Sequence, residues 1–349
     1  ASAALNSSRR HQSQQVSLPD ETPLISAIMF AAGIIGNVAA LVILEIRRRR
    51  NMRTGSTSHH GLFHILIKSL VITDLTGTCL ITPLVQVSYA RNQTLVGMST
   101  GTWSFCWYFG VSMTFFSLAT MLLLFTTALE RCFAITYPYL YNRHVTKKCA
   151  YIAILLVFLL STLFCLLPFA GFGEYVQYCP GTWCFIHMSP ETPVNRVYAI
   201  LYATIMLVLV LAIIVFNGFV MYQLYRMYQR RKRNGSVTVT MRSNSDRKVM
   251  SIAEEVEHLI LLVFMTVIFS ICTLIYRNEK WLLHSSVNAL RFISINSIVD
   301  PWVFILLSPG VQHFCWASVC FNHFTPNASA VTQHTSKVLP FVDFWQQIL

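Results

Sequence analysis

Long, nearly charge-free apolar runs alternate with short polar or basic connections along this chain. A helix needs about 20 predominantly apolar residues to cross the hydrocarbon core of a bilayer. These runs are too long, and alternate too little, to be the strands of a membrane barrel. The pattern therefore predicts an all-α bundle of seven transmembrane helices, over residues 22–44, 62–90, 92–129, 149–173, 197–225, 258–276 and 286–308.

Composition supports the membrane interpretation. Of the 349 residues, 54% are hydrophobic and only 11% are charged, whereas soluble proteins carry about a quarter charged residues. The balance is basic, with 26 Lys and Arg against 14 Asp and Glu and a net charge of +12. Because the basic residues stand in short blocks between apolar runs, we expect contact with membrane lipids and no nucleic-acid partner.

The basic blocks also predict the orientation. They follow the first, third and fifth spans, and such blocks stay on the cytosolic side. We therefore expect an extracellular tail over 1–21, a transmembrane domain over 22–308 with a cytosolic loop at about 226–257, and a cytosolic segment over 309–349. Two glycosylation sequons, at Asn6 and Asn92, fall outside.

Polar residues inside spans are costly, so each one suggests a function. Asn37, Asp74 and Asp300 lie at comparable depths and could share a polar cluster, either with a cation or water or as a structural hydrogen-bonded knot. Glu130 and Arg131 close span three at its cytosolic end. They are either an ordinary interfacial pair or a latch that opens towards a partner.

Arg291 lies in the outer half of span seven. An Arg stays charged, and its planar guanidinium binds a carboxylate through two hydrogen bonds. Among the acidic residues of the sequence, none is placed in the outer half of a span to neutralise it. We therefore expect a ligand anion there, with snorkelling to the interface as the alternative.

The cysteines divide by side of the membrane. Cys106, at the outer end of span three, and Cys184, in the outer loop 174–196, face an oxidising compartment and predict a disulfide. Cys315 and Cys320 follow the last span beside aromatic residues, a setting typical of acylation.

Catalytic motifs are missing from the sequence. A hydrolase elbow, a phosphate-binding glycine loop and a zinc helix are absent, and the residues flanking Asp74 and Asp300 do not support an aspartyl pair. We therefore expect no enzyme, cofactor or metal site, and a transporter is a distant alternative.

Several motifs together resemble class A G-protein-coupled receptors. They are Gly36-Asn37, Asp74 in TDLTG, Glu130-Arg131-Cys132 and Asp300-Pro301. Within that class, the Asp-Pro-Trp form, the GTWCF stretch at 181–185 and Arg291 in ALRF resemble the prostanoid receptor family. The resemblance covers roughly residues 22 to 308 and implies a multi-pass receptor of the plasma membrane.

Further stretches are most similar to the Gs-coupled receptors for prostaglandin E2. They include SYARNQTLV at 88–96, MTFFSLATM at 113–121 and YVQYCPGTWCF at 175–185. The resemblance implies prostaglandin E2 as ligand, Gs as partner and a rise in cAMP. Receptors for prostaglandin D2 and for prostacyclin share several of these stretches and are the nearest alternatives.

The resemblance also implies roles for matching residues. Arg291 would hold the prostaglandin carboxylate, assisted by Thr182 and Tyr89, beneath a second outer loop held as a lid by the disulfide. The remaining candidates for the ligand site are Thr78, Met29, Trp183 and Ser297. The switch towards the G protein would use Glu130, Arg131, Asp74, Asn37, Asp300 and Pro301.

One departure from the family concerns span six. Cys272-Thr273-Leu274 leads directly into Ile275-Tyr276-Arg277 without the Pro that the family has there, so the span is shortened by roughly a dozen residues and lacks the usual hinge. The chain is then either a divergent but competent receptor or a signalling-impaired variant that acts by pairing with intact receptors.

Overall fold

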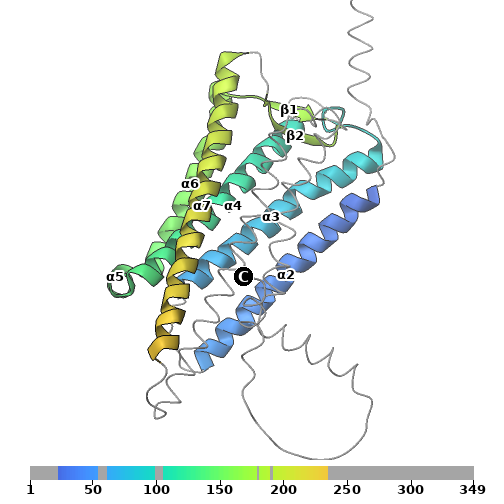
Figure 1. Cartoon of the computed structure of the whole chain (residues 1–349). Helices are drawn as coiled ribbons and strands as arrows, with labels where there is room; N and C mark the ends of the chain where they lie inside the picture. The colour runs from blue at the N-terminus through green and yellow to red at the C-terminus, as the bar shows by residue number, and fades with distance from the viewer. Residues whose placement is uncertain (1–22, 54–60, 99–104, 179–180, 189–191, 235–349) are drawn as a thin grey trace, which may run out of the picture. The chain divides into compact units, whose positions relative to one another are not determined.

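The structure is a computed structural model that describes residues 23–53, 61–98, 105–178, 181–188 and 192–234 (Figure 1). Five helices in this part are long and apolar enough to cross a membrane. They are α2 (Pro23–Arg53), α3 (Gly61–Arg91), α4 (Phe105–Thr136), α6 (Lys147–Leu166) and α7 (Pro193–Asn234). They correspond to the first five predicted spans.

The sixth and seventh predicted spans lie outside the described residues. The same holds for several residues singled out from the sequence, namely Asn6, Arg291, Ser297, Asp300, Pro301, Cys315 and Cys320.

The backbone ladder of each helix satisfies its main-chain polar groups internally, as a span in lipid must. Besides the backbone ladder, threonine hydroxyls donate to the carbonyl one turn back along the same helix. Thr73 donates to Ser69 over 2.8 Å, and Thr114 donates to Gly110 over 2.8 Å. These threonines therefore fit an apolar run without leaving a hydroxyl unsatisfied.

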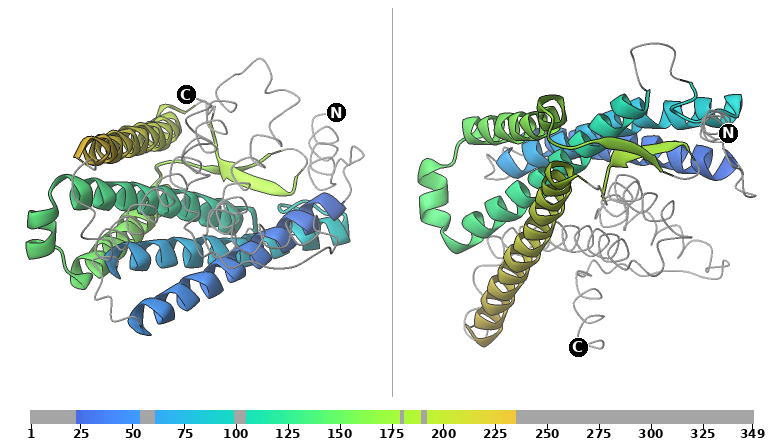
Figure 2. Two further views of the ribbon diagram at one scale, coloured as in Figure 1. Left: turned by 60° about the horizontal axis from the view of Figure 1, so that its bottom comes forward. Right: turned by 90° about the horizontal axis from the view of Figure 1, so that it is seen from above.

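Helix α4 is the centre of the packing. It contacts α3, α6 and α7, while α2 packs on α3 (Figures 1 and 2). Gly77 of α3 lets α4 approach closely, because a Cβ at this position would lie 2.9 Å from the ring of Phe116. The buried residues of α4, among them Phe109, Leu118, Met121 and Leu124, form much of the hydrophobic core.

The predicted start of span three at residue 92 is wrong. Asn92 has a left-handed φ of 49°, and the residues up to Met98 form turns. The amides of Asn92 and Gln93 bond back to carbonyls at the end of α3, and the amide of Leu95 bonds to Gly181 of the outer loop, so these residues do not form the first turn of α4. Helix α4 begins at Phe105 and runs past residue 129 to Thr136.

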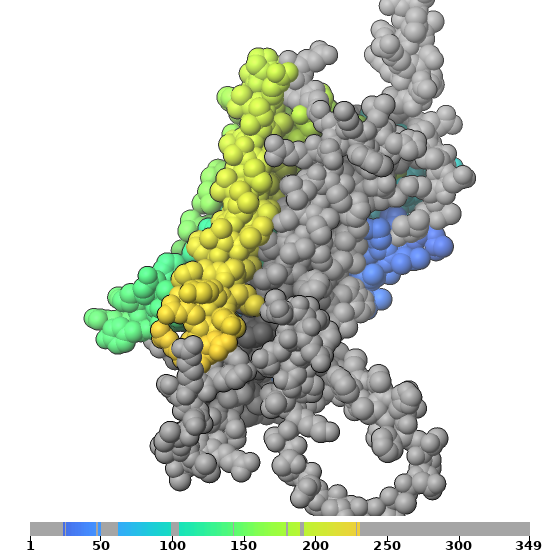
Figure 3. Space-filling model, viewed as in Figure 1, coloured from blue at the N-terminus to red at the C-terminus, as the bar shows by residue number. Residues whose placement is uncertain are grey.

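Helix α7 continues past residue 225 to Asn234, so the first residues of the segment predicted as a cytosolic loop, from about 226, are helical. Its 42 residues span about 63 Å at 1.5 Å per residue, about twice the hydrocarbon core. Arg, Gln and Met are good helix formers, and the side chain of Gln229 donates to the Tyr225 hydroxyl one turn back. Figure 3 shows α7 along one face of the molecule. Apolar side chains of α7 such as Val215 are exposed.

Three short elements connect the spans. The 3₁₀ helix η1 (Leu167–Ala170) ends α6, and α5 (Pro138–His144) follows α4 at its inner end. In the outer loop, β1 (Tyr175–Tyr178) pairs antiparallel with β2 (Trp183–Ile186). We call these two strands together the outer hairpin. The hairpin was not predicted, and it leaves the all-α class unchanged.

Candidate ligand and switch sites

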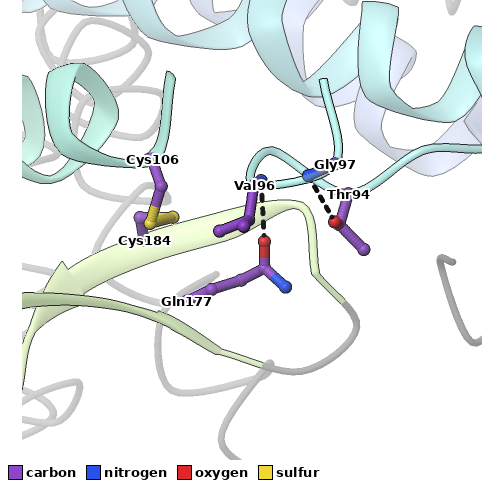
Figure 4. Close-up of a disulfide and its surroundings, with 6 residues drawn as sticks. All are labelled: Thr94, Val96, Gly97, Cys106, Gln177 and Cys184. Carbon is purple, nitrogen blue, oxygen red and sulfur yellow. Dashed lines mark hydrogen bonds between the residues drawn. A yellow bond between two sulfur atoms is a disulfide. The ribbon is translucent and has the colours of Figure 1, made fainter. Parts of the chain in front are cut away.

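The outer hairpin is covalently attached to α4. The predicted disulfide is present between Cys106, in the first turn of α4, and Cys184 of β2, with a Cα–Cα distance of 5.2 Å (Figure 4). Gly110, one turn further along α4, lets the hairpin approach closely, because a Cβ there would lie 2.5 Å from the Tyr175 ring. The hairpin therefore lies directly on the outer end of α4.

A second attachment joins the hairpin to the turn that follows α3. The amide of Leu95 donates to the carbonyl of Gly181 over 2.9 Å. The amide of Val96 donates to the side-chain carbonyl of Gln177 over 3.0 Å (Figure 4). The turn itself is closed by the amide of Gly97, which donates to the Thr94 hydroxyl over 3.0 Å. The hairpin is thus held by α4 on one side and by this turn on the other.

The hairpin also closes on itself. The hydroxyl of Tyr178 donates to the carbonyl of Ile186 over 2.8 Å and accepts from the amide of Met188 over 3.2 Å. Burial raises the pKa of this phenol above its ordinary value, so it remains a donor at physiological pH. A closed hairpin with two attachments provides rigid positions for the residues that it carries.

Thr182 and Trp183, both expected at the ligand site, lie in this rigid part. Thr182 is fully buried, and its hydroxyl has no hydrogen-bond partner among the residues that the structure describes. Trp183 is buried against Phe109 of α4, with ring centroids 5.7 Å apart in an edge-to-face arrangement. A buried hydroxyl without a partner costs free energy, so a hydrogen-bonding group brought to Thr182 would offset that cost.

The other described ligand candidates differ in what they can offer. Tyr89 is half-buried at the outer end of α3 and packs against the hydrophobic core. The hydroxyl of Thr78 donates to the carbonyl of Asp74 over 2.7 Å, so its hydrogen is already used within α3. Met29 is a half-buried residue of α2. Thr78 can accept a hydrogen bond from a ligand but not donate one without breaking the helix bond.

Asp74 and Asn37, expected to share a polar cluster, are both buried. A carboxylate oxygen of Asp74 accepts a hydrogen bond from the Thr120 hydroxyl of α4 over 2.9 Å. The side-chain amide of Asn37 donates to the carbonyl of Gly33 over 2.9 Å, within α2. The bond of Asp74 therefore crosses between two helices, whereas this bond of Asn37 stays within one.

Glu130 and Arg131 form a buried bidentate ion pair. Nε and Nη2 of Arg131 lie 2.5 and 2.6 Å from the two carboxylate oxygens of Glu130, and both side chains are almost inaccessible. An ion pair in a dry environment needs further partners to offset its desolvation. Two residues that were not singled out from the sequence contact it.

The first is Tyr141 of α5, whose hydroxyl donates to a Glu130 oxygen. Burial and the Glu130 charge raise the pKa of this phenol above its ordinary value, so it stays a donor at physiological pH. The second is Phe63 of α3, whose ring centre lies 4.3 Å from the guanidinium carbon of Arg131. In this arrangement Arg131 is held in place and is not presented to the cytosol.

Similarity to known proteins identifies the family of this chain. Residues 36–304 match the family model described as the 7 transmembrane receptor (rhodopsin family). The prostaglandin E2 receptor EP2 subtype of Rattus norvegicus is 43% identical over 358 residues, covering 95% of this chain and 98% of the relative. The human receptor of the same name is 43% identical, covering 86% and 87%. The chain belongs to the prostanoid branch of this receptor family.

The prostanoid receptor also resembles relatives with another ligand in their name. The prostacyclin receptor of Mus musculus is 42% identical over 300 residues, covering 83% of this chain and 68% of that relative. Among solved structures, squid rhodopsin matches 92% of each chain with a TM-score of 0.66 at 14% identity, which shows the seven-helix fold. The predicted seven-transmembrane class is therefore confirmed.

Family membership confirms three further predictions for this prostanoid receptor. It is a multi-pass protein of the plasma membrane, it is not an enzyme, and it takes a lipid ligand and a G-protein partner. The roles of individual residues stay predictions.

Sequence reasoning missed Phe63, Thr120 and Tyr141 in this prostanoid receptor. A signal existed for Tyr141, because Pro138 after span three is typical of a helix start, and a helix here brings aromatic residues back to Glu130. Thr120 could have been noticed as a hydroxyl in the span that follows Asp74. Phe63 carried no signal, since a single aromatic residue at the start of a span is usual.

Proposed function

We propose that this chain is a prostaglandin E2 receptor that couples to Gs and raises cAMP. The observation that carries the proposal is the structural role of two stretches that are similar to E2-type receptors, residues 88–96 and 175–185. They are hydrogen-bonded to each other through Leu95 and Gly181 and through Val96 and Gln177. The similarity to E2-type relatives from rat and human, which covers most of both chains, also supports it.

In this proposal the ligand carboxylate binds Arg291, the unpaired cation expected in the outer half of span seven. The Thr182 hydroxyl donates a second hydrogen bond to the same carboxylate. This bond would give the buried hydroxyl of Thr182 a partner. Charge-assisted hydrogen bonds are about twice as strong as neutral ones, and they strengthen further where a cover of protein excludes water. The doubly attached outer hairpin supplies such a cover.

The body of the ligand is apolar with a few hydroxyl and keto groups, so apolar walls with occasional polar atoms suit it. Trp183, Met29 and Tyr89 supply apolar and aromatic surface, while Thr78 and Ser297 supply polar atoms. Because the Thr78 hydrogen is donated to Asp74, its oxygen would accept a hydrogen bond from a ligand hydroxyl.

Signalling follows from a shift between two states. A ligand shifts the equilibrium only by its difference in affinity for the two. In the state that couples, Arg131 leaves Glu130 and meets the G protein. In the other state Arg131 is bound by Glu130 and contacted by Phe63, as in the described arrangement. Asp74, Asn37, Asp300 and Pro301 belong to the same switch, at the depth where the spans must move.

Competition binding tests the ligand. Membranes from cells that express the full chain are incubated with labelled prostaglandin E2 and increasing unlabelled prostaglandin E2, prostaglandin D2 or a prostacyclin mimic, and cAMP is measured in the same cells. We expect prostaglandin E2 to displace the label at the lowest concentration and to raise cAMP. Preference for either competitor, or a surface-expressed receptor that leaves cAMP unchanged, would overturn the proposal.

A conservative substitution tests the binding residue in the hairpin. Thr182→Val keeps the shape of the side chain and removes the hydroxyl. If Thr182 binds the carboxylate, the affinity for prostaglandin E2 falls about 10- to 150-fold, since a hydrogen bond to a charged group contributes about 1.5–3 kcal/mol. If the hydroxyl is merely buried without a partner, removing it stabilises the protein and leaves the affinity unchanged.

The matched control is Thr162→Val. Thr162 is an exposed residue of α6 whose hydroxyl donates to the Phe158 carbonyl over 2.8 Å, so its replacement should leave the affinity unchanged. Arg291→Ala should abolish high-affinity binding, and Arg291→Lys should restore part of it, because Lys keeps the charge and loses the bidentate geometry. Equal affinities of the Ala and Lys variants would contradict the ion pair.

A further inference from the structure

Phe63 and Arg131 form a buried cation–π contact between two spans. Phe63 lies in the first turn of α3 and Arg131 near the inner end of α4. The guanidinium carbon lies 4.3 Å from the ring centre, and the residues are only 3% and 4% exposed. A contact this close and this dry belongs to the stronger members of its class.

The geometry gives the ring a particular role. Glu130 contacts the edge of the guanidinium through Nε and Nη2, while the face of this planar group lies over the Phe63 ring. Edge and face are therefore used by different partners. The partner at the edge is the preceding residue of the same helix, so it moves with Arg131, whereas the ring belongs to another helix.

We propose that Phe63 is a positioning residue for the switch, whose ring holds Arg131 on Glu130 and so favours the uncoupled state. Because the ring belongs to α3, a movement of Arg131 towards a G protein breaks the cation–π contact between Phe63 and Arg131. This inference rests on the proposed function in one respect, namely that Arg131 meets the G protein when the receptor couples.

The alternative role of Phe63 is that of a core residue that contributes apolar surface alone. Fluorination separates the two, because ring fluorines withdraw the negative charge from the ring face and change the size of the side chain little. A series with one, two and three fluorines on the Phe63 ring therefore weakens the attraction to Arg131 stepwise. A purely apolar role predicts no such graded response.

The first readout is the reactivity of Arg131 itself. Purified full-length receptor without ligand is treated with phenylglyoxal, and modification of Arg131 is quantified by mass spectrometry relative to the exposed Arg49. We expect modification to rise with each fluorine, to about tenfold for the trifluoro ring. Phe63→Trp, which strengthens the ring face, should keep it low. An unchanged rate across the series would overturn the proposal.

The second readout is ligand-free nucleotide exchange on purified Gs, Gi and Gq heterotrimers with the receptor in lipid nanodiscs. We expect basal exchange to rise with the same order of fluorination. A rise on Gi or Gq instead of Gs would support the positioning role of Phe63 and contradict the proposed coupling. Increased reactivity of Arg131 without a rise on any heterotrimer would overturn the link from Phe63 to the switch.

Phe125 is the matched control. It lies in α4 about two turns before Arg131, and its ring packs on Phe216 with centroids 5.9 Å apart. The same fluorinated residues at position 125 change an aromatic contact between spans. Both readouts should stay at the level of the unmodified receptor. If fluorination of Phe125 raised them as much as fluorination of Phe63, the effect would be one of general packing and the proposal would fail.

Discussion

The carboxylate of Asp74 in α3 accepts a 2.9 Å hydrogen bond from the hydroxyl of Thr120 in α4. Both residues lie within spans and are buried. Polar groups in such surroundings cost free energy unless they are paired. The Thr120 hydroxyl therefore contributes to the stability of the packed α3–α4 pair.

Thr120→Val should destabilise the receptor by about 1–3 kcal/mol, because the substitution keeps the shape and leaves a buried carboxyl group with one partner fewer. Thermal unfolding of the purified receptor in detergent measures the loss. The control is Thr76→Val in α3, whose exposed hydroxyl donates within its own helix to Ile72. A surface change of this kind should stay within about 0.5 kcal/mol. Similar losses in both variants would contradict the role of Thr120.

Removing the disulfide should release the outer hairpin from α4. Cys106→Ser and Cys184→Ser each open a link between residues 78 positions apart in sequence. Each should lower stability by about 2–5 kcal/mol and weaken ligand binding, since the hairpin then depends on its hydrogen bonds to the turn after α3.

The double variant tests whether the two cysteines act as one unit. It should lose no more stability than either single variant, because the effects of two substitutions that break the same bond do not add. Cys149→Ser, at an exposed free cysteine, should leave the unfolding temperature unchanged. Additive losses from the two single variants would show that the cysteines act separately.

The number and order of the first five spans could be predicted from the scarcity of charge, but two boundaries could not. A charge-free window does not detect the turns at 92–98, because their polar groups are uncharged and the amides of Leu95 and Val96 bond to the outer hairpin, which is distant in sequence. At the end of α7, the density of Arg up to Asn234 is typical of a cytosolic loop. The helix propensity of these residues decides the structure instead.

The candidate site was predictable to a similar extent. Glu130 and Arg131 were visible in the sequence, but the choice between a simple pair and a latch depends on Phe63 and Tyr141. Phe63 is 68 positions before Arg131, and only the packing of α3 on α4 brings the two together. The Thr182 hydroxyl, which has no partner within the described part of the chain, was equally hidden, because the sequence does not show that the outer loop forms a hairpin on α4.

Gly181→Ala should disrupt the connection of the hairpin to the turn after α3. Gly181 has a φ of 102°, and a Cβ there would lie 2.5 Å from Cγ2 of Thr94. Gly171 is the matched control, since its φ of 85° imposes similar backbone strain and its surroundings are open. Gly171→Ala should cost about 1–2 kcal/mol of stability, and Gly181→Ala should cost more.

Thr94→Ser removes the clashing methyl group and keeps the hydroxyl that accepts from Gly97. Combined with Gly181→Ala, it should reduce the loss of stability towards the level of Gly171→Ala, with a 3.1 Å approach to the Cβ of residue 94 remaining. Thermal unfolding of the four variants measures this. A loss that Thr94→Ser does not reduce would show that backbone strain, and not the contact with Thr94, decides the effect.

Asn92 should carry an N-linked glycan. Asn92 itself is exposed and has a left-handed backbone, in the turn that is hydrogen-bonded to the disulfide-linked and therefore extracellular hairpin. Asn92→Gln should remove one glycosidase-sensitive shift in gel mobility and leave the shift from Asn6. The control is Asn234, a sequon residue at the end of α7 that the basic residues place in the cytosol. Asn234→Gln should leave the mobility unchanged. A shift lost in Asn234→Gln and kept in Asn92→Gln would mean that the orientation of the receptor is the reverse.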